Sequence, residues 1–205
     1  IAGAEKALID VSETASRSGF KTIQDILNLN FASLEARSQQ TTDITGIATG
    51  YRELDKMTTG LHEEELIILA ARPAVGKTAF ALSMASNMSI RNGITTAFFS
   101  LEMSNVQLVN RIIVNVCEIT GDKIRSGQLA PYEWAQLDNR IKKLHDAPLF
   151  VDDTPSLSVF ELRTKARRLV REHGIKLIMI DYLQLMNASG MSYGSRQEEV
   201  STISR

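Results

Sequence analysis

The spacing of apolar residues in the first part of the chain predicts two helices. Between residues 1 and 18, apolar side chains recur three or four positions apart, at Ala4, Leu8, Val11 and Ala15, and Gly19 follows as a stop. A second pattern consists of Ile23, Ile26, Leu27, Phe31 and Leu34, and the polar stretch SQQTTDITG comes after it. We therefore expect an amphipathic helix over residues 1–18, a helical connection over residues 19–43, and a compact domain over residues 44–205.

Within that domain, short apolar runs alternate with helical patterns. Four runs have the length of strands, at residues 66–71, 95–100, 149–152 and 177–181. Strands that alternate with helices in the sequence pair side by side in a parallel sheet, and the helices cover its faces. The pattern therefore predicts an α/β fold with a mainly parallel sheet flanked by helices.

Three helix starts in this domain have recognisable local signals. Ser104 with Gln107 and Ser158 with Glu161 have capping-box spacing, in which two side chains satisfy amides that the helix leaves unpaired. Pro131 suits the first turn of a third helix. The apolar stripe of this third helix is expected to be buried, and it consists of Trp134, Leu137, Ile141 and Leu144.

Composition and charge narrow the class of protein. Apolar residues make up 43% and charged residues 23% of the 205 residues, and the formal net charge is -1, which is typical of a globular protein. No stretch approaches the roughly 18 consecutive apolar residues of a membrane span. We expect a cytoplasmic protein without a membrane partner, in which the single cysteine, Cys117, fills part of the core.

A candidate phosphate-binding loop joins the first predicted strand to a helical pattern. Gly76 allows close approach of the backbone to a phosphate, Lys77 supplies a positive charge, and the Thr78 hydroxyl is a ligand for magnesium. The residues expected to hold a nucleotide are Arg72, Pro73, Ala74, Val75, Gly76, Lys77, Thr78 and Ala79. The strict pattern has glycine where this chain has Ala71, so the alternative is an ordinary turn that carries Gly-Lys-Thr by chance.

Two carboxylates follow predicted strands and are expected at the same edge of the sheet. Asp181 ends an apolar run, where ligands bind in open parallel sheets, and it is a candidate for holding magnesium opposite Thr78. Glu102 follows residues 95–100 and is a candidate for polarising the water that attacks the terminal phosphate. In the alternative interpretation, each carboxylate only favours the start of the next helix.

The sequence resembles the replicative hexameric DNA helicases of the DnaB type, whose motor is a RecA-like P-loop NTPase. The similar segments are residues 43–61, 70–82, 98–104, 151–159, 180–186 and 195–205. The resemblance implies ATP and Mg²⁺ as cofactors, Lys77 and Glu102 in catalysis, and Thr78 and Asp181 at the metal. It accepts alanine at position 71, and it places Arg72 and Gln184 in the nucleotide-binding motifs.

The resemblance also implies an assembly that is larger than one chain. Members of this family form homo-hexamers, move along single-stranded DNA and work with a loader and a primase. They carry a further N-terminal domain, and after the position of Arg205 they carry DNA-contacting loops and an arginine offered to the neighbouring subunit. We therefore expect the 205 residues to be incomplete at both ends and, alone, to hydrolyse ATP negligibly.

Several alternatives remain open at this stage. Residues 1–18 are, by resemblance, the linker helix that docks on an adjacent subunit, or they pack on their own domain. Tyr193 and Arg196 lie in a segment that contacts DNA or is a surface loop. The arginines and Lys165 of residues 158–173 form a nucleic-acid face or a solvated outer helix. In place of a helicase, the chain is an ATP-controlled loader or recombination mediator, or a small-molecule kinase.

Overall fold

The computed structural model of the chain describes residues 22–38 and 44–186. The chain divides into two compact units, Ile1–Asp43 and Ile44–Arg205. In the first unit, the predicted second helix is present as α2 (Ile23–Ser38), and its apolar residues Ile23, Ile26, Leu27, Phe31 and Leu34 are exposed. The helix predicted over residues 1–18 lies outside the described residues.

The second unit is built around a parallel sheet. Its three strands, β1 (Thr96–Ser100), β2 (Leu149–Asp152) and β3 (Leu177–Asp181), lie in the order β2-β1-β3. β1 is buried along its whole length, and Phe98 pairs in register with Val151 on one side and Met179 on the other. These strands are three of the four that the sequence predicts, and the predicted parallel arrangement is confirmed.

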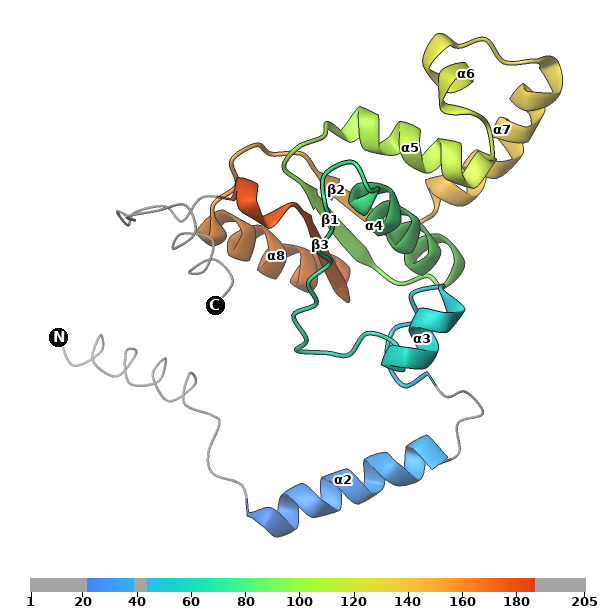
Figure 1. Cartoon of the computed structure of the whole chain (residues 1–205). Helices are drawn as coiled ribbons and strands as arrows, with labels where there is room; N and C mark the ends of the chain where they lie inside the picture. The colour runs from blue at the N-terminus through green and yellow to red at the C-terminus, as the bar shows by residue number, and fades with distance from the viewer. Residues whose placement is uncertain (1–21, 39–43, 187–205) are drawn as a thin grey trace. The chain divides into compact units, whose positions relative to one another are not determined.

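Helices cover both faces of this sheet, as Figure 1 shows. On one face, α4 (Lys77–Ser86) and α5 (Asn105–Cys117) supply Leu82, Ala85, Leu108 and Ile112 to a core with Phe98. On the other face, α8 (Val159–His173) packs Leu162 and Leu169 against Ala97 and Phe99. The domain therefore has three layers, and the alternating side chains of β1 face two separate apolar cores.

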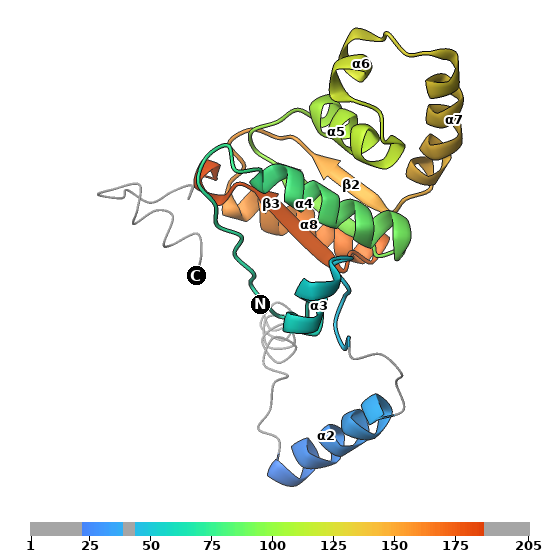
Figure 2. The same ribbon diagram turned by 45° about the vertical axis from the view of Figure 1, so that its right-hand side comes forward.

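The predicted capping boxes and the proline start are confirmed. Ser104 and Gln107 cap α5, Ser158 and Glu161 cap α8, and Pro131 opens α7 (Pro131–His145). Figure 2 shows α5, α6 (Gly121–Ser126) and α7 as a group of helices beside β2. The last carbonyls of α5 are satisfied by α7: Gln136 donates to the Cys117 carbonyl over 2.6 Å, and Arg140 donates to the Val116 carbonyl over 3.0 Å. Cys117 is buried, as predicted.

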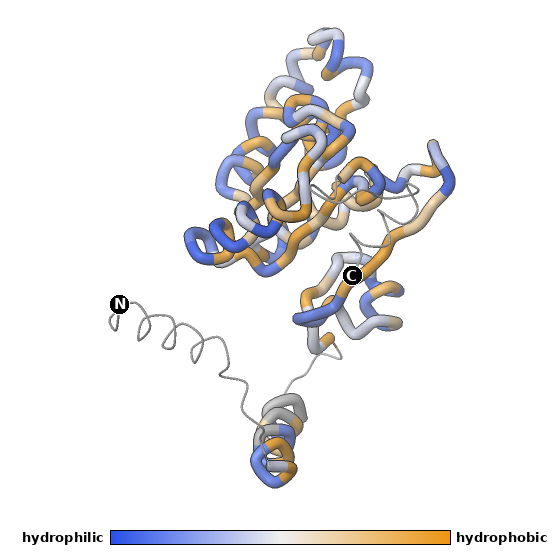
Figure 3. Tube along the Cα trace, turned by 90° about the vertical axis from the view of Figure 1, so that its left-hand side faces the viewer, coloured by the Kyte–Doolittle hydropathy of each residue, from blue (hydrophilic) through white to orange (hydrophobic). Residues whose placement is uncertain are grey.

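The predicted strand over residues 66–71 is wrong. These residues have no regular secondary structure, and Leu66, Ile67, Ile68 and Leu69 are between 43% and 72% exposed. Figure 3 colours the segment as an apolar run. A strand is stable only when a neighbouring strand pairs with it, and within the described residues β3 pairs with β1 alone. Apolar composition predicted the propensity of this segment, but not whether a partner accepts it.

The predicted buried stripe of α7 is only partly correct. Trp134 is 49% and Ile141 is 38% exposed, whereas Leu137 and Leu144 are half-buried. Because α7 packs mainly on α5, at the side of the sheet, only part of its apolar surface is covered. The buried residue in its first turn is Glu133, which caps α7 and pairs with Lys123 over 2.6 Å.

Three short elements complete the described domain. α3 (Arg52–Thr58) precedes the sheet, η1 (Asn87–Arg91) extends α4 by a π-helical turn, and η2 (Leu183–Leu185) is a 3-10 turn after β3. No helix in the described ranges is long and apolar enough to cross a membrane.

Candidate nucleotide-binding site

The loop before α4 has a backbone suited to an anion. Ala74 and Gly76 have positive φ angles of 64° and 105°, and the Val75 amide donates to the Arg72 carbonyl over 3.4 Å. A Cβ atom added at Gly76 would meet nothing within 4 Å, so open space adjoins the backbone at this point. Glycine is the residue that adopts such a φ without steric cost. The sequence therefore folds residues 72–76 into a turn that leaves its backbone accessible.

The first turn of α4 supplies positive potential next to this loop. Lys77 and Thr78 begin the helix after the N-cap residue Gly76, and the first turn contains no acidic residue. The first amides of any helix lack partners within the helix, and they attract anions. Lys77 and Thr78 are half-buried, whereas Arg72, Pro73, Ala74, Val75 and Ala79 are exposed. The predicted phosphate loop is therefore an exposed turn that leads into a helix start.

A pair of aromatic rings fixes the first turn of α4 from the side of α3. Tyr51, the N-cap of α3, stacks on Phe80 with ring centroids 4.8 Å apart and planes 19° apart. Further along α4, Leu82 and Ala85 lie in the core. Offset stacking of this kind adds to the free energy gained by burial. The helix start is therefore held by packing on both sides of the phosphate loop.

The carboxyl ends of β1 and β3 are tied together. The Leu101 amide donates to the Asp181 carbonyl over 2.8 Å, and the Met103 amide donates to the Ser100 hydroxyl over 3.1 Å. These bonds bring the chain segments that carry Glu102 and Asp181 out of adjacent strands at one edge. Glu102 is exposed, whereas Asp181 is only 4% exposed.

Lys77 and Asp181 meet at this edge. The Lys77 Nζ atom lies 3.6 Å from Asp181 Oδ1, and the same Nζ lies 4.3 Å from the centroid of the Tyr182 ring. The structure therefore brings together the loop lysine and the strand-end carboxylate that the sequence selected separately. Sequence reasoning missed Tyr182. The available signal was an aromatic residue directly after a carboxylate at the end of a buried strand.

The donor set fits a nucleotide with a divalent cation. Asp181 Oδ2 is buried and has no hydrogen-bond partner in the described part of the chain. A buried carboxylate oxygen without a partner is costly unless a cation or a donor reaches it. The Thr78 hydroxyl and the amides of the loop are the other groups that Mg²⁺ and phosphates prefer. The residues present therefore suit the predicted ATP and Mg²⁺.

Other predicted site residues lie apart from this arrangement. Gln184 is exposed in η2. Tyr193 and Arg196 lie outside the described residues. On α8, Lys165 pairs with Asp152 over 2.6 Å, Arg168 pairs with Glu172 over 3.0 Å, and the Arg163 guanidinium lies 5.5 Å from the centroid of the Phe160 ring. Part of the basic character of α8 is therefore used within the domain.

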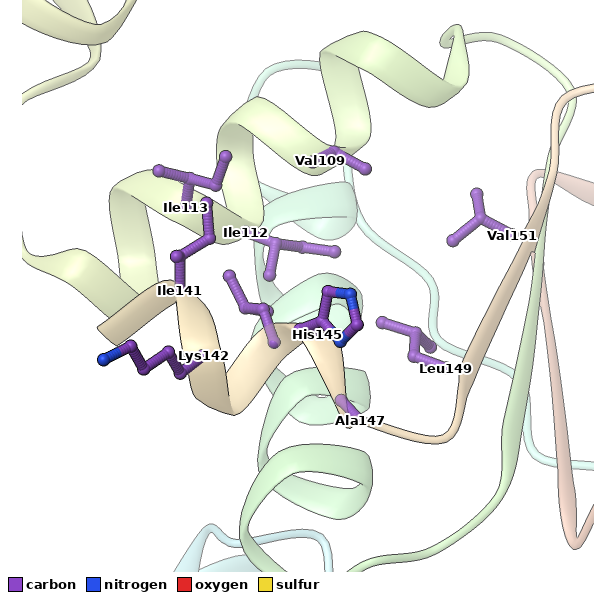
Figure 4. Close-up of a pocket in the computed structure, with 10 residues that line it drawn as sticks. Val109, Ile112, Ile113, Ile141, Lys142, His145, Ala147, Leu149 and Val151 are labelled. Atoms are coloured by element: carbon purple, nitrogen blue, oxygen red, sulfur yellow. The ribbon is translucent and has the colours of Figure 1, made fainter. Parts of the chain in front are cut away.

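A separate apolar hollow of about 420 Å³ lies between α5, α7 and β2. In Figure 4, Ile112 and Ile113 of α5 and Ile141 of α7 line it, with His145 at one side. No residue of the predicted nucleotide site lines this hollow. Its apolar lining offers nothing to a phosphate, so it does not belong to the nucleotide site.

Fold and site together define the class of an α/β P-loop NTPase with a RecA-like fold. The family model described as the DnaB-like helicase C-terminal domain matches residues 46–205. The chain belongs to this family.

Similar proteins agree with this assignment. The chain is 45% identical to the replicative DNA helicase DnaB of Geobacillus stearothermophilus and 44% identical to the replicative DNA helicase DnaC of Bacillus subtilis, in each case over 98% of this chain and 44% of the relative. A solved helicase-type ATPase domain has a TM-score of 0.82 and 32% identity over 90% of this chain and 65% of its own. A structure titled as a DnaB-like replicative helicase and its interactions with primase has a TM-score of 0.77 and 31% identity, over 99% of this chain and 48% of its own. The chain thus spans less than half the length of these curated relatives.

Proposed function

We propose that this chain is the motor portion of a replicative DNA helicase, an enzyme that couples ATP hydrolysis to translocation on single-stranded DNA and to duplex unwinding at the replication fork. The observation that supports this most directly is the meeting of Lys77 and Asp181 at one sheet edge, with Asp181 Oδ2 left without a partner in the described residues. Family membership and the likeness to replicative helicases supply the kind of reaction.

In this proposal each residue has a separate role. Lys77 and the amides of residues 72–79 bind the phosphates, and Arg72 and Gln184 contribute from the adjoining motifs. Thr78 and Asp181 hold Mg²⁺, which when bound would neutralise phosphate charge. Glu102 accepts a proton from the attacking water and orients it. Such catalysis depends mostly on positioning and electrostatics, and fixed groups at one sheet edge can supply both.

The proposed assembly is a cytoplasmic homo-hexamer on single-stranded DNA that works with a loader and a primase. Support comes from the replicative helicase relatives and from the structural neighbour whose title names primase. Residues 1–18 form the linker helix that docks on a neighbouring subunit, residues 19–43 connect it to the motor, and Tyr193 and Arg196 contact the DNA. These last roles rest on resemblance alone.

The test separates hydrolysis from binding in the full-length protein that contains this chain. Single-stranded DNA should stimulate ATP hydrolysis, and Glu102→Gln should remove that hydrolysis while nucleotide affinity is retained, because the amide cannot accept the proton. Glu63→Gln, at an exposed position outside the site, is the matched control and should hydrolyse ATP as the wild type does.

Two results would change the proposal. Undiminished turnover in Glu102→Gln would remove this residue from catalysis. Tight ATP binding by the wild type without hydrolysis, even on single-stranded DNA, would favour the alternative of an ATP-controlled loader or recombination mediator, since such a switch needs no water activator.

A further inference from the structure

The ammonium group of Lys77 is held between two adjacent residues of one segment. Its Nζ is 3.6 Å from Asp181 Oδ1 and 4.3 Å from the centroid of the Tyr182 ring. The first distance exceeds that of a hydrogen bond, which is about 2.7–3.2 Å. The second lies well within the roughly 6 Å over which a cation is attracted to the face of an aromatic ring. The ring is therefore a full partner of the ammonium.

Other lysine–carboxylate pairs in this chain close to a shorter distance. Lys165 lies 2.6 Å from Asp152, and Lys123 lies 2.6 Å from Glu133. Asp181 is as buried as Glu133, and burial strengthens the attraction between opposite charges. The Lys77–Asp181 pair nevertheless stays open by a further 1.0 Å, the difference between 3.6 and 2.6 Å. The contact with the Tyr182 ring accounts for this, because it attracts the ammonium without a short ion pair.

We propose that Tyr182 is a positioning residue that holds the Lys77 ammonium beside Asp181 without letting the two groups close into a hydrogen-bonded pair. This inference rests on the proposed function of the site. A closed pair would occupy Asp181 and draw Lys77 away from the phosphate loop. An open pair keeps both groups available, so that Asp181 can face a cation and Lys77 can face a phosphate.

The neutral charge of the ring is what suits it to this role. A second carboxylate in its place would hold the ammonium more strongly, and the phosphates would then have to displace it. The face of a phenol ring attracts the ammonium but carries no net charge to compete with a phosphate. Tyr182 is half-buried, so its contact with Lys77 is partly shielded from water.

The contact can be tested first without any nucleotide. An ammonium group over a ring face places its neighbouring methylene protons in the ring current, so the Lys77 ε-proton resonance of the ligand-free chain should lie upfield of that of the exposed Lys56. Tyr182→Phe, which keeps the ring, should retain the upfield position. Tyr182→Leu, which removes the ring, should lose it, and Tyr132→Leu is the control at an exposed tyrosine of α7.

Nucleotide binding gives the second readout. Tyr182→Leu should weaken the affinity for ATP with Mg²⁺ by about threefold to tenfold, as expected for one cation–ring contact, and Tyr182→Phe should restore it. The Mg²⁺ concentration at half-maximal nucleotide binding should also rise in Tyr182→Leu, because Lys77 then closes on Asp181. A general loss of folding would instead weaken binding equally with and without Mg²⁺.

The outcomes distinguish this inference from the assignment of the site. A Lys77 resonance in the wild type with no upfield displacement would overturn the role of Tyr182, whatever the variants do. Equal Mg²⁺ dependence in wild type and Tyr182→Leu would do the same. If the chain bound no ATP at all, or if Lys77→Ala bound it as tightly as the wild type, the nucleotide site itself would be wrong.

Discussion

Asp55 accepts two hydrogen bonds from Thr49, one of 2.7 Å from the backbone amide and one of 2.6 Å from the hydroxyl. Both residues are buried, and Asp55 takes a third bond of 3.2 Å from the Gly50 amide. The carboxylate thereby fixes the turn that leads into α3. Tyr51, the next residue of that turn, stacks on Phe80 in the first turn of α4. The buried Asp55 therefore supports the nucleotide site through α3.

Replacing Asp55 should destabilise the domain. In Asp55→Ala, buried donors of Thr49 and Gly50 lose their acceptor, and each unsatisfied group costs about 1–3 kcal/mol. We expect the free energy of unfolding to fall by about 2–4 kcal/mol, measured by urea denaturation with circular dichroism. Asp138→Ala, at an exposed position on α7, should change it by less than about 0.5 kcal/mol. Equal stabilities for these two variants would contradict the role of Asp55.

The ion pair between Asp152 and Lys165 should make stability depend on acidity. Burial raises the pKa of Asp152, but the hydrogen bonds from Lys165 and Thr154 outweigh it, so the pKa lies below its usual value. Because the folded-state pKa is lowered, this stabilisation is complete above the unfolded pKa of about 3.9 and is lost as the pH falls through the folded value. Lys165→Met should therefore cost about 1–2 kcal/mol at pH 7.

The same variant supplies its own control at low pH. The difference in urea midpoint between wild type and Lys165→Met should shrink below about pH 4, because protonated Asp152 no longer attracts Lys165. Comparing differences cancels the titration of the other carboxylates. A difference that stayed constant from pH 7 to below pH 3 would mean that Lys165 stabilises α8 by packing rather than by charge.

Removing the loop lysine should abolish most nucleotide affinity. Lys77→Ala deletes the charged donor that faces the phosphates, a change worth about 1.5–3 kcal/mol, or tenfold or more in affinity. The measurement is a titration with a fluorescent ATP analogue in the presence of Mg²⁺. Lys56→Ala, which removes an exposed lysine of α3, should bind as the wild type does. If the two variants bound equally well, phosphate binding would have to be assigned elsewhere.

The 205-residue chain by itself should hydrolyse ATP negligibly. By resemblance, a ring motor completes each site with an arginine from the adjacent subunit, and such arginines are worth about 10³ to 10⁵ in turnover. A steady-state ATPase assay, with and without single-stranded DNA and beside the full-length protein, measures this. Turnover comparable to that of the full-length protein would show that one chain holds a complete active site, and the ring-helicase proposal would then fail.

Residues 1–18 should matter for assembly and not for folding. Their apolar stripe is narrow, which suits an interface between subunits. In the full-length protein, deletion of residues 1–18 should leave the thermal unfolding of the motor in place while light scattering shows smaller assemblies than the hexamer. A hexamer of unchanged stability after the deletion would place the helix on its own domain.

Local signals in the sequence predicted the fold well, and long-range pairing explains the misses. The capping boxes at Ser104 and Ser158 depend on neighbouring residues only, and both are present. The run at residues 66–71 has strand propensity, but a strand also needs a partner, which no local pattern specifies. Trp134 and Ile141 have the spacing of a buried stripe, yet how far a helix is covered depends on distant elements.

The candidate site divides in the same way. Gly76, Lys77 and Thr78 follow one another, so their motif is readable directly, and the meeting of Lys77 with Asp181 followed from the rule that ligands bind where parallel strands end. Tyr182 was missed because its role depends on where the side chain of Lys77 points. Roles for residues 1–18, Tyr193 and Arg196 remain predictions, since they lie outside the described residues.

The unpaired segment at residues 66–69 also has a consequence for the colloidal behaviour of the chain. Four large aliphatic side chains stand in solvent directly before the phosphate loop, and in the described structure one edge of β3 has no neighbouring strand. Exposed apolar runs and open strand edges are templates for association between copies. In concentrated solution the chain is therefore expected to self-associate through this region. Solubility and nucleotide affinity would then report on the same few residues, so a ligand that orders the loop should also keep the chain dispersed.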